Sequence, residues 1–278
     1  MSAKCMFLHE LSTLDRDIRM LHASAKIRPD RYGRLSEKLD ELCRLIVSAS
    51  GERDWDLWGS DKEIWACCGR LREGAVQALC DVEKHQAFNL NGDSLGRREY
   101  DFLLSESVKA ELDDCRIDSS SRVLFIGAGA FPLSAMTIAC EARAEVVCSD
   151  IDPEAVAWGA RVVRTCAPGA RIRYAETTDE AYAFAREATH VVIASLVENK
   201  RDVLDRLKPG LAPAAKVVVR YGNGLKAVFN YPLEPELTRD WRRTEVNCGS
   251  GMYDTVVLEK RPEPAFSGAA APGQGQFL

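Results

Sequence analysis

A glycine turn between an apolar run and a helical run is the sharpest chemical signal in the sequence. Phe125-Ile126-Gly127-Ala128-Gly129-Ala130-Phe131-Pro132 closes the apolar run that starts at Val123, and helical spacing begins again at Leu133. Gly127 permits the tight turn, and Gly129 lets a ligand approach the backbone closely. Asp150 ends the next apolar run, roughly 20 residues after Gly129. At this distance along the chain a carboxylate can accept hydrogen bonds from both hydroxyls of a ribose. Together these signals predict a nucleoside site held by Gly127, Ala128, Gly129 and Asp150.

The residue at position 132 narrows the choice of nucleoside. A pyrophosphate-binding turn has a third glycine there, so that the helix packs closely and its N-terminus faces two phosphates. Pro132 suits a cofactor that has no phosphate, and S-adenosylmethionine is such a cofactor. The competing interpretation is structural, because an aspartate at this place can simply cap the next helix. Asp152 suits that cap better, since it precedes Pro153, whereas Asp150 suits the ribose.

The elements that must position this turn divide the chain into two halves of different texture. Residues 1–115 show helical periodicity with almost no strand signal, and from about 120 short apolar runs alternate with helical segments. Such alternation is typical of a parallel, doubly wound sheet. The expected fold is therefore α/β, a class I methyltransferase-like Rossmann sheet with an N-terminal helical domain. We expect three regions: a helical domain at 1–115, an S-adenosylmethionine-binding domain at 116–262 and a disordered tail at 263–278.

Individual elements follow from the same periodicities. Four helices are expected in the first half, around 8–21, around 35–46, from the candidate N-cap Ser60-Asp61 to about 79, and from 99 to 108. In the second half we expect strands at 123–126, 146–149, 171–174, 191–194 and 216–220, with helices at 133–140, 153–164, 179–187 and 199–207. The segments 243–246 and 255–259 predict an antiparallel hairpin at one edge of the sheet.

Further cofactor contacts are expected where strands end, because ligands of such sheets bind outside the carboxyl ends of the strands. Ile151 follows the ribose acid directly. Thr177, or its neighbours Thr178 and Asp179, follows the third strand on the adenine side. Ser195 and Leu196 follow the fourth strand and are expected to line the amino-acid end of the cofactor.

Composition excludes several other classes of protein. The chain has 278 residues and a formal net charge of −5, so no overall basic field attracts nucleic acid. Its ten cysteines contain no Cys-x-x-Cys spacing, which argues against a zinc site and favours reduced thiols. No apolar run approaches the roughly 20 residues that span a bilayer. We expect a cytoplasmic protein that binds small molecules, with no metal, nucleic acid or membrane partner.

Several segments, in the same order along the chain, resemble nicotianamine synthases over roughly residues 88 to 260. The glycine turn resembles F-(I/V)-G-(S/G)-G-P-L-P-L-T, and Asp150-Ile151-Asp152-Pro153 resembles D-x-D-P. Ala194-Ser195-Leu196-Val197 resembles A-A-L-V, and Leu211 to Ala215 resembles M-A-P-G-A. The set Arg220, Gly224 and Tyr231-Pro232 resembles R-S-x-x-G followed by Y-P, and the upstream set Asn91, Leu95 and Glu99-Tyr100-Asp101 resembles N-Y-x-x-L-x-x-x-E-(F/Y)-(D/E). Departures at Gly92, Ala130-Phe131 and Gly222-Asn223 bring the chain closest to the bacterial members that serve opine metallophores, the histidine aminobutanoyltransferases.

The resemblance implies transfer of the 3-amino-3-carboxypropyl (aminobutanoyl) arm of S-adenosylmethionine to the amine of an amino acid, with methylthioadenosine as by-product. Histidine is the expected acceptor, and its configuration and another amino acid in its place are left open. Glu99 matches an acidic residue of the family and would take the proton of the acceptor amine. The alternative is an exposed glutamate paired with Arg97 or Arg98. Arg220 would clamp a substrate carboxylate or form an ion pair at the end of a strand. Tyr231 would line the acceptor pocket or serve in packing.

Two other functions are compatible with the same residues. A small-molecule N-methyltransferase on this fold would release S-adenosylhomocysteine instead of methylthioadenosine. A nucleoside-binding module would bind the cofactor without turnover. The resemblance also leaves a homodimer open, because helical caps of this kind often pair.

Overall fold

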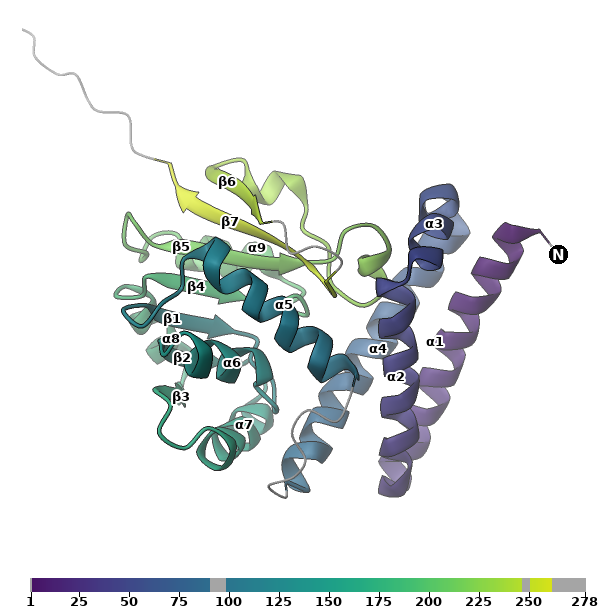
Figure 1. The fold of residues 1–278 in the computed structure, drawn as a ribbon, viewed down its shortest axis with the longest axis horizontal. Coiled ribbons are helices and arrows are strands. Elements are labelled where there is room, and N and C mark those ends of the chain that lie inside the picture. Colours follow the sequence, from purple (N-terminus) through teal and green to yellow (C-terminus); the bar gives the residue numbers. More distant parts are fainter. Residues whose placement is uncertain (1, 91–98, 247–250, 262–278) are drawn as a thin grey trace, which may run out of the picture.

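The computed structural model describes residues 2–90, 99–246 and 251–261, which form a layer of helices beside a seven-stranded sheet (Figure 1). The helical layer contains α1 (Ala3–Ile27), η1 (Pro29–Arg31), α2 (Tyr32–Val47), α3 (Ala49–Trp58) and α4 (Lys62–Phe88). Asp61 caps α4 by accepting hydrogen bonds from the backbone N–H groups of Glu63 and Ile64, as predicted. The sequence did not predict α3. The predicted tail at 263–278 lies outside the described residues.

The helical layer has a core of its own. The apolar positions that recur at helical spacing in α1 and α2 are buried, among them Leu11, Leu14, Ile18, Leu35 and Leu39. They pack against the apolar face of α4, so the three long helices share one core. Long α4 therefore presents one face to the helical layer and leaves another for the sheet domain.

The sheet has the strand order β3-β2-β1-β4-β5-β7-β6. Its strands are β1 (Arg122–Ile126), β2 (Glu145–Ser149), β3 (Ile172–Tyr174), β4 (His190–Ile193), β5 (Lys216–Tyr221), β6 (Trp241–Val246) and β7 (Asp254–Lys260). The first five are parallel, while β7 lies antiparallel to both β5 and β6. The predicted α/β class and the predicted hairpin at the edge are confirmed. From β1 the chain order runs outward to β2 and β3 on one side and, after a crossover, to β4 and β5 on the other. Ligands of such sheets bind at this switch between β1 and β4.

Helices cover both faces of the sheet. They are α5 (Glu99–Cys115), α6 (Leu133–Glu141), α7 (Pro153–Cys166), α8 (Thr178–Ala185) and α9 (Lys200–Leu207), with the short turns η2 (Gly224–Val228) and η3 (Pro235–Thr238) near the edge. Val123 and Phe125 of β1 join the core under α5, α6 and α7, whereas Leu124 joins the core under α8 and α9. This alternation follows from the two-residue period of a strand.

Helix α5 connects the two parts of the molecule. Near its start Tyr100, Leu103 and Leu104 pack on the core of the helical layer, whereas Val108 and Cys115 belong to the core of the sheet. The helix thus crosses from one layer to the other. The predicted boundary between residues 115 and 116 therefore falls after a helix that also covers the sheet.

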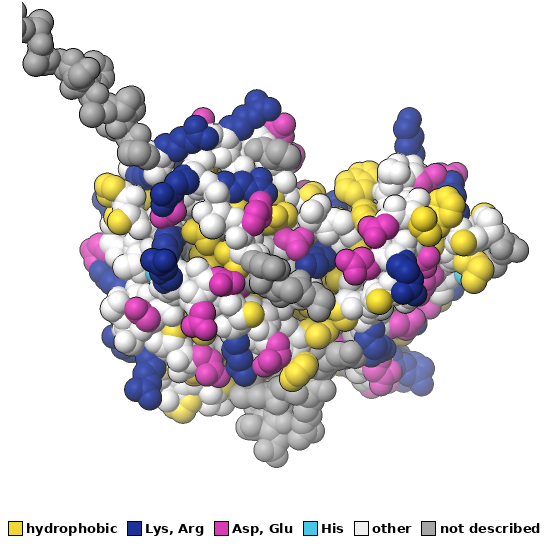
Figure 2. Space-filling view, turned by 45° about the horizontal axis from the view of Figure 1, so that its top comes forward, with side chains coloured by type: hydrophobic (Ala, Val, Ile, Leu, Met, Phe, Trp, Pro, Cys, Tyr) yellow, Lys and Arg dark blue, Asp and Glu magenta, His cyan; other side chains and the backbone are white. Residues whose placement is uncertain are grey.

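The surface carries charges of both signs. On the face shown in Figure 2, lysine and arginine side chains are interspersed with aspartate and glutamate side chains. In the part of the chain that the structure describes, no helix is long and apolar enough to cross a membrane.

Candidate active site

A pocket of about 560 Å³ lies at the carboxyl ends of β1, β2 and β4, and α4 and α5 form its other wall. Its lining includes most of the residues that the sequence predicted, namely Gly127, Ala128, Gly129, Asp150, Ile151, Ser195, Leu196, Arg220 and Tyr231. Pro132 instead sits between the lining residues Phe131 and Leu133 as the N-cap of α6. Thr177 caps α8 by accepting from the backbone N–H of Glu180, and its neighbour Thr178 reaches the lining.

The glycine turn has a backbone conformation and close neighbours that only glycine tolerates. Gly127 and Gly129 have φ angles of +80° and +71°, a region that residues with a Cβ rarely adopt. A Cβ at Gly127 would overlap the side chain of Val197, and a Cβ at Gly129 would overlap a carboxylate oxygen of Glu83. The turn is held in place because the backbone N–H of Gly127 donates to the carbonyl of Ser149 at the end of β2 (2.9 Å).

The two acidic residues after β2 have different places in the structure. Asp152 forms the predicted helix cap, and Asp150 lines the pocket. Asp152 caps α7, since its carboxylate accepts from the backbone N–H of Glu154 (2.9 Å). Asp150 lines the pocket, where one carboxylate oxygen accepts from the backbone N–H of Gly129 (2.8 Å) and the other from that of Asp152 (3.0 Å). The carboxylate is therefore fixed beside the glycine turn.

Helix α4 contributes an acidic residue that the sequence did not predict. Val76, Leu79, Cys80 and Glu83 lie on one face of α4 and line the pocket opposite the glycine turn. The Cys80 thiol is exposed toward the pocket, where partial desolvation by the surrounding protein, together with the charges of Glu83 and Asp150, raises its pKa to about 12. The thiol therefore stays neutral. A carboxylate on each side of the pocket favours a ligand with positive charge.

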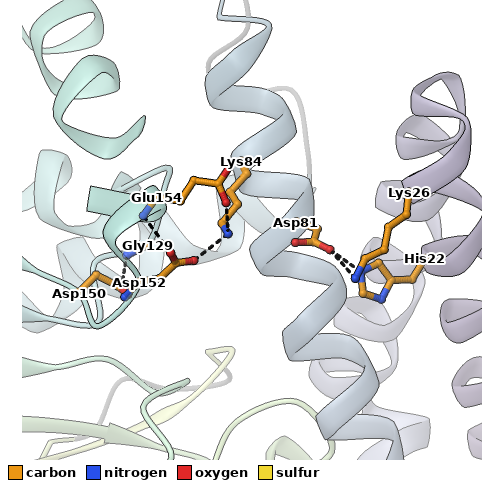
Figure 3. A network of polar contacts seen from close by, with 8 residues as sticks. All are labelled: His22, Lys26, Asp81, Lys84, Gly129, Asp150, Asp152 and Glu154. Atoms are coloured by element: carbon orange, nitrogen blue, oxygen red, sulfur yellow. Dashed lines mark hydrogen bonds and ion pairs between the residues drawn. The ribbon is translucent and has the colours of Figure 1, made fainter. Parts of the chain in front are cut away.

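A polar network connects α4 to the sheet domain on one side and to α1 on the other (Figure 3). On the sheet side, Lys84 forms ion pairs with Asp152 and Glu154, both at 2.7 Å. On the other side, Asp81 pairs with Nε2 of His22 at 2.7 Å and with Lys26 at 3.2 Å. Because these contacts hold the turn of α4 that carries Glu83, its carboxylate is held facing Gly129.

Arg220 is engaged by an ion pair. Its side chain is 2% exposed, and its Nε donates to Glu111 of α5 (2.9 Å) while another nitrogen donates to Ser134 (3.0 Å). The hydroxyls of Tyr253 and Thr255 donate to the same glutamate. The geometry is that of the ion-pair alternative, and it fastens α5 and the start of α6 to β5.

The other predicted acceptor residues lie toward the helical layer. Glu99 begins α5, but its side chain lies outside the described residues, so its catalytic role stays a prediction. Tyr231 lines the pocket and donates its hydroxyl hydrogen to Glu73 of α4 (2.9 Å). Burial and this hydrogen bond raise the pKa of Tyr231, so the phenol is a neutral donor at physiological pH.

Lys200 is a buried cation behind the pocket wall. Burial, with a contribution from Arg72, lowers the pKa of its ammonium from 10.5 to about 7. The folded protein thus binds this proton more weakly than the unfolded chain, and the free energy of unfolding should rise with pH between about 7 and 10.5. We expect this contribution to approach about 1 kcal/mol per pH unit and to be absent from Lys200→Met.

Denaturant titrations of both proteins from pH 7 to pH 9.5 measure this difference. Equal slopes of unfolding free energy against pH in the two proteins would contradict a depressed pKa at Lys200.

Comparison with known proteins shows to which family the chain belongs. Residues 88–263 match the family model for nicotianamine synthase protein, which covers more than half of the chain. The chain belongs to the nicotianamine synthase family, which confirms the resemblance inferred from its motifs.

Particular relatives have a more specific name. The chain is 37% identical over 260 residues to a Pseudomonas aeruginosa protein named L-histidine 2-aminobutanoyltransferase, with 94% of this chain and 99% of the relative covered. A Yersinia pestis protein with the same name is 29% identical over 258 residues, covering 92% of this chain and 96% of the relative.

Solved structures share the fold. A Glu-to-Gln variant of MtNAS in complex with S-adenosylmethionine has a TM-score of 0.72 at 17% identity, covering 89% of this chain and 98% of that chain. MtNAS in complex with MTA and tNA has a TM-score of 0.72 at 16% identity, covering 91% and 98%. These similarities confirm the predicted fold class. Among the described residues, no group of three or more His, Cys, Asp or Glu could hold a metal ion.

Proposed function

We propose that this chain transfers the aminobutanoyl arm of S-adenosylmethionine to the α-amino group of L-histidine and releases methylthioadenosine. The observation that supports it most directly is the meeting of the glycine turn, Asp150 and Glu83 around one pocket. The turn admits no Cβ, so its backbone and the carboxylates of Asp150 and Glu83 lie close together beside the space for a nucleoside. The names of the relatives supply the arm that is transferred and the acceptor.

The chain's own residues have distinct tasks in this reaction. Asp150 accepts hydrogen bonds from the ribose hydroxyls, and the Gly127–Gly129 turn lies against the nucleoside. Thr178 and Tyr182 of α8 line the side of the pocket toward the adenine. Bound S-adenosylmethionine supplies a sulfonium, which makes its attached carbons electrophilic.

Glu83 is the proton acceptor in this proposal. The histidine amine is mostly ammonium at neutral pH and has no lone pair until it loses a proton. Before that transfer the negative charge of Glu83 helps to bind the two positively charged substrates, and Glu83 then takes the proton of the amine. The amine nitrogen then forms a bond to the terminal carbon of the aminobutanoyl arm. The bond between that carbon and sulfur breaks, and both electrons stay on the sulfur of methylthioadenosine.

Asp150→Asn tests the ribose contact. Removing an ionised acceptor of this kind costs about 1.5–3 kcal/mol, so we expect the dissociation constant for S-adenosylmethionine to rise about 10- to 100-fold. Titration calorimetry of the folded variant measures it. Glu187→Gln is the matched control, since Glu187 is an exposed carboxylate that pairs with Arg122 at the start of β1 and lies outside the lining. We expect its affinity to stay within about threefold of the original.

Product analysis tests the reaction as a whole. The purified chain is incubated with S-adenosylmethionine and either L- or D-histidine, and the nucleoside product is identified by mass spectrometry. We expect methylthioadenosine together with an aminobutanoyl-histidine, formed faster from the L isomer. S-adenosylhomocysteine with a methylated histidine would assign the chain to the N-methyltransferases instead. Binding without any product would reduce it to a nucleoside-binding module.

We further propose that the enzyme works in the cytoplasm on small molecules alone and that its product is a nicotianamine-like precursor of an opine metallophore. A homodimer remains part of this proposal, to be tested by the mass of the purified protein in solution.

A further inference from the structure

Lys200 occupies a position that is unfavourable for a lysine on two counts. Its side chain is only 1% exposed, so its ammonium is removed from water. It is also the first residue of α9, where the positive end of the helix dipole disfavours a cation. An apolar side chain would fill the same space without either cost. The formation of α9 therefore does not account for a lysine here.

Its contacts join two segments that are distant in the sequence. The Nζ atom donates to the carbonyls of Val197 (2.6 Å) and Ser195 (3.1 Å) in the loop after β4. It also donates to the carbonyl of Tyr231 (3.4 Å), which follows η2. The backbone N–H of Tyr231 donates to the carbonyl of Ser195 (3.1 Å), so the two segments meet at this point.

All three carbonyls belong to residues that line the pocket, whereas Lys200 lies outside the lining. The side chain of Val197 packs on Gly127, in the space that a Cβ there would occupy. Tyr231 reaches the other wall, where its hydroxyl contacts Glu73 of α4. The ring of Tyr231 also lies 5.1 Å from the guanidinium of Arg72 and 5.8 Å from the Lys200 ammonium. The Lys200 side chain therefore fixes the position of Val197, which contacts the cofactor turn, relative to Tyr231, which contacts the helical layer.

We propose that Lys200 is a positioning residue for the transfer, which holds Val197 against the cofactor turn and Tyr231 against α4 so that the reacting arm and the acceptor amine are aligned. This inference rests on the proposed function. The alignment of two reactants is sensitive to displacements of about 1 Å, which can lower rates by 10²-fold. A lysine that costs stability but sets this alignment explains why the position is not apolar.

Three variants of the full chain test the inference. Lys200→Met removes the donors, and Lys200→Arg keeps a cation with several N–H donors. Lys208→Met is the matched control, since Lys208 follows the same helix and is partly exposed beside Asp240. For each protein we would measure the melting temperature, the dissociation constant for S-adenosylmethionine, and KM and kcat with histidine.

We expect Lys200→Met to stay folded, because the carbonyls of Ser195 and Tyr231 keep backbone donors from Tyr231 and Gly222. Its kcat/KM for histidine should fall about tenfold or more, mainly through kcat because the bound reactants are misaligned, and its affinity for S-adenosylmethionine should also weaken. Lys200→Arg should fall between it and the original protein, and Lys208→Met should match the original. A folded Lys200→Met with unchanged KM, kcat and cofactor affinity would overturn the inference.

Two further outcomes keep the test decisive. If Lys200→Met does not fold, Lys200→Gln replaces it, and unchanged kcat and KM for histidine in that variant would overturn the inference. If the original protein makes no aminobutanoyl-histidine, the proposed function fails. The affinity for S-adenosylmethionine then still decides the role of Lys200, since equal affinities in the original protein and Lys200→Met would refute it.

Discussion

Glu83→Gln is expected to lower kcat by about 10²- to 10⁴-fold, the range that a positioned general base contributes. The amide cannot take the proton of the acceptor amine, so the amine stays an ammonium without a lone pair. The fold should be unchanged, because glutamine has nearly the same shape and the ion pairs of Lys84 and Asp81 still hold α4. Steady-state rates of methylthioadenosine formation with saturating histidine measure the effect.

The matched control for this experiment is Glu63→Gln, which removes an exposed carboxylate from the first turn of the same helix. Its kcat should match that of the original protein. Glu99→Gln should be measured in parallel, because the family resemblance assigns the base to Glu99. If Glu99→Gln loses the larger factor and Glu83→Gln keeps a normal kcat, the base is Glu99.

Arg220→Met is expected to lower the free energy of unfolding by about 3–5 kcal/mol, the cost of leaving one member of a buried ion pair uncompensated. The carboxylate of Glu111 is 3% exposed and would retain only hydroxyl donors such as Tyr253 and Thr255. Denaturant titration measures the loss. The double variant Arg220→Met with Glu111→Leu should regain most of it, since an apolar pair leaves no buried charge.

Arg239→Ala is the control for this prediction. Arg239 pairs with Glu236 across an exposed helical turn, with 75% of its side chain in solvent. Such pairs contribute about 0–1 kcal/mol. If Arg220→Met were no more destabilised than Arg239→Ala, the buried pair would not be what fastens α5 to the sheet.

The half of the candidate site around the glycine turn was predictable because its signals are local. A strand, a glycine turn and a helix N-terminus are adjacent in the sequence, and parallel strands bring the residue after the next strand beside that turn. Gly127, Gly129 and Asp150 meet in the pocket for this reason. The caps at Asp61 and Asp152 were predictable on similarly local grounds.

The acceptor half was less predictable because its contacts are remote in sequence. Glu83 lies on a helix whose packing against the sheet no local pattern reveals, although an acidic residue in the apolar stripe of Val76, Leu79 and Cys80 could have drawn attention. Arg220 and Glu111 are separated by 109 residues, so periodicity could not choose between an ion pair and a substrate clamp.

Helix α3 was missed for a different reason. It has only ten residues, and its first half contains Gly51 and charged residues, so Trp55 and Trp58 at its end are too few apolar positions to reveal a helix in sequence.

The fate of the methyl group tests the central claim most directly. S-adenosylmethionine labelled with ¹³C in its methyl group is incubated with the protein and L-histidine, and both products are weighed by mass spectrometry. The account predicts that all of the label leaves on methylthioadenosine and that the histidine product gains an unlabelled aminobutanoyl group. Label on the histidine product would contradict it, because the pocket would then direct the acceptor to the methyl carbon.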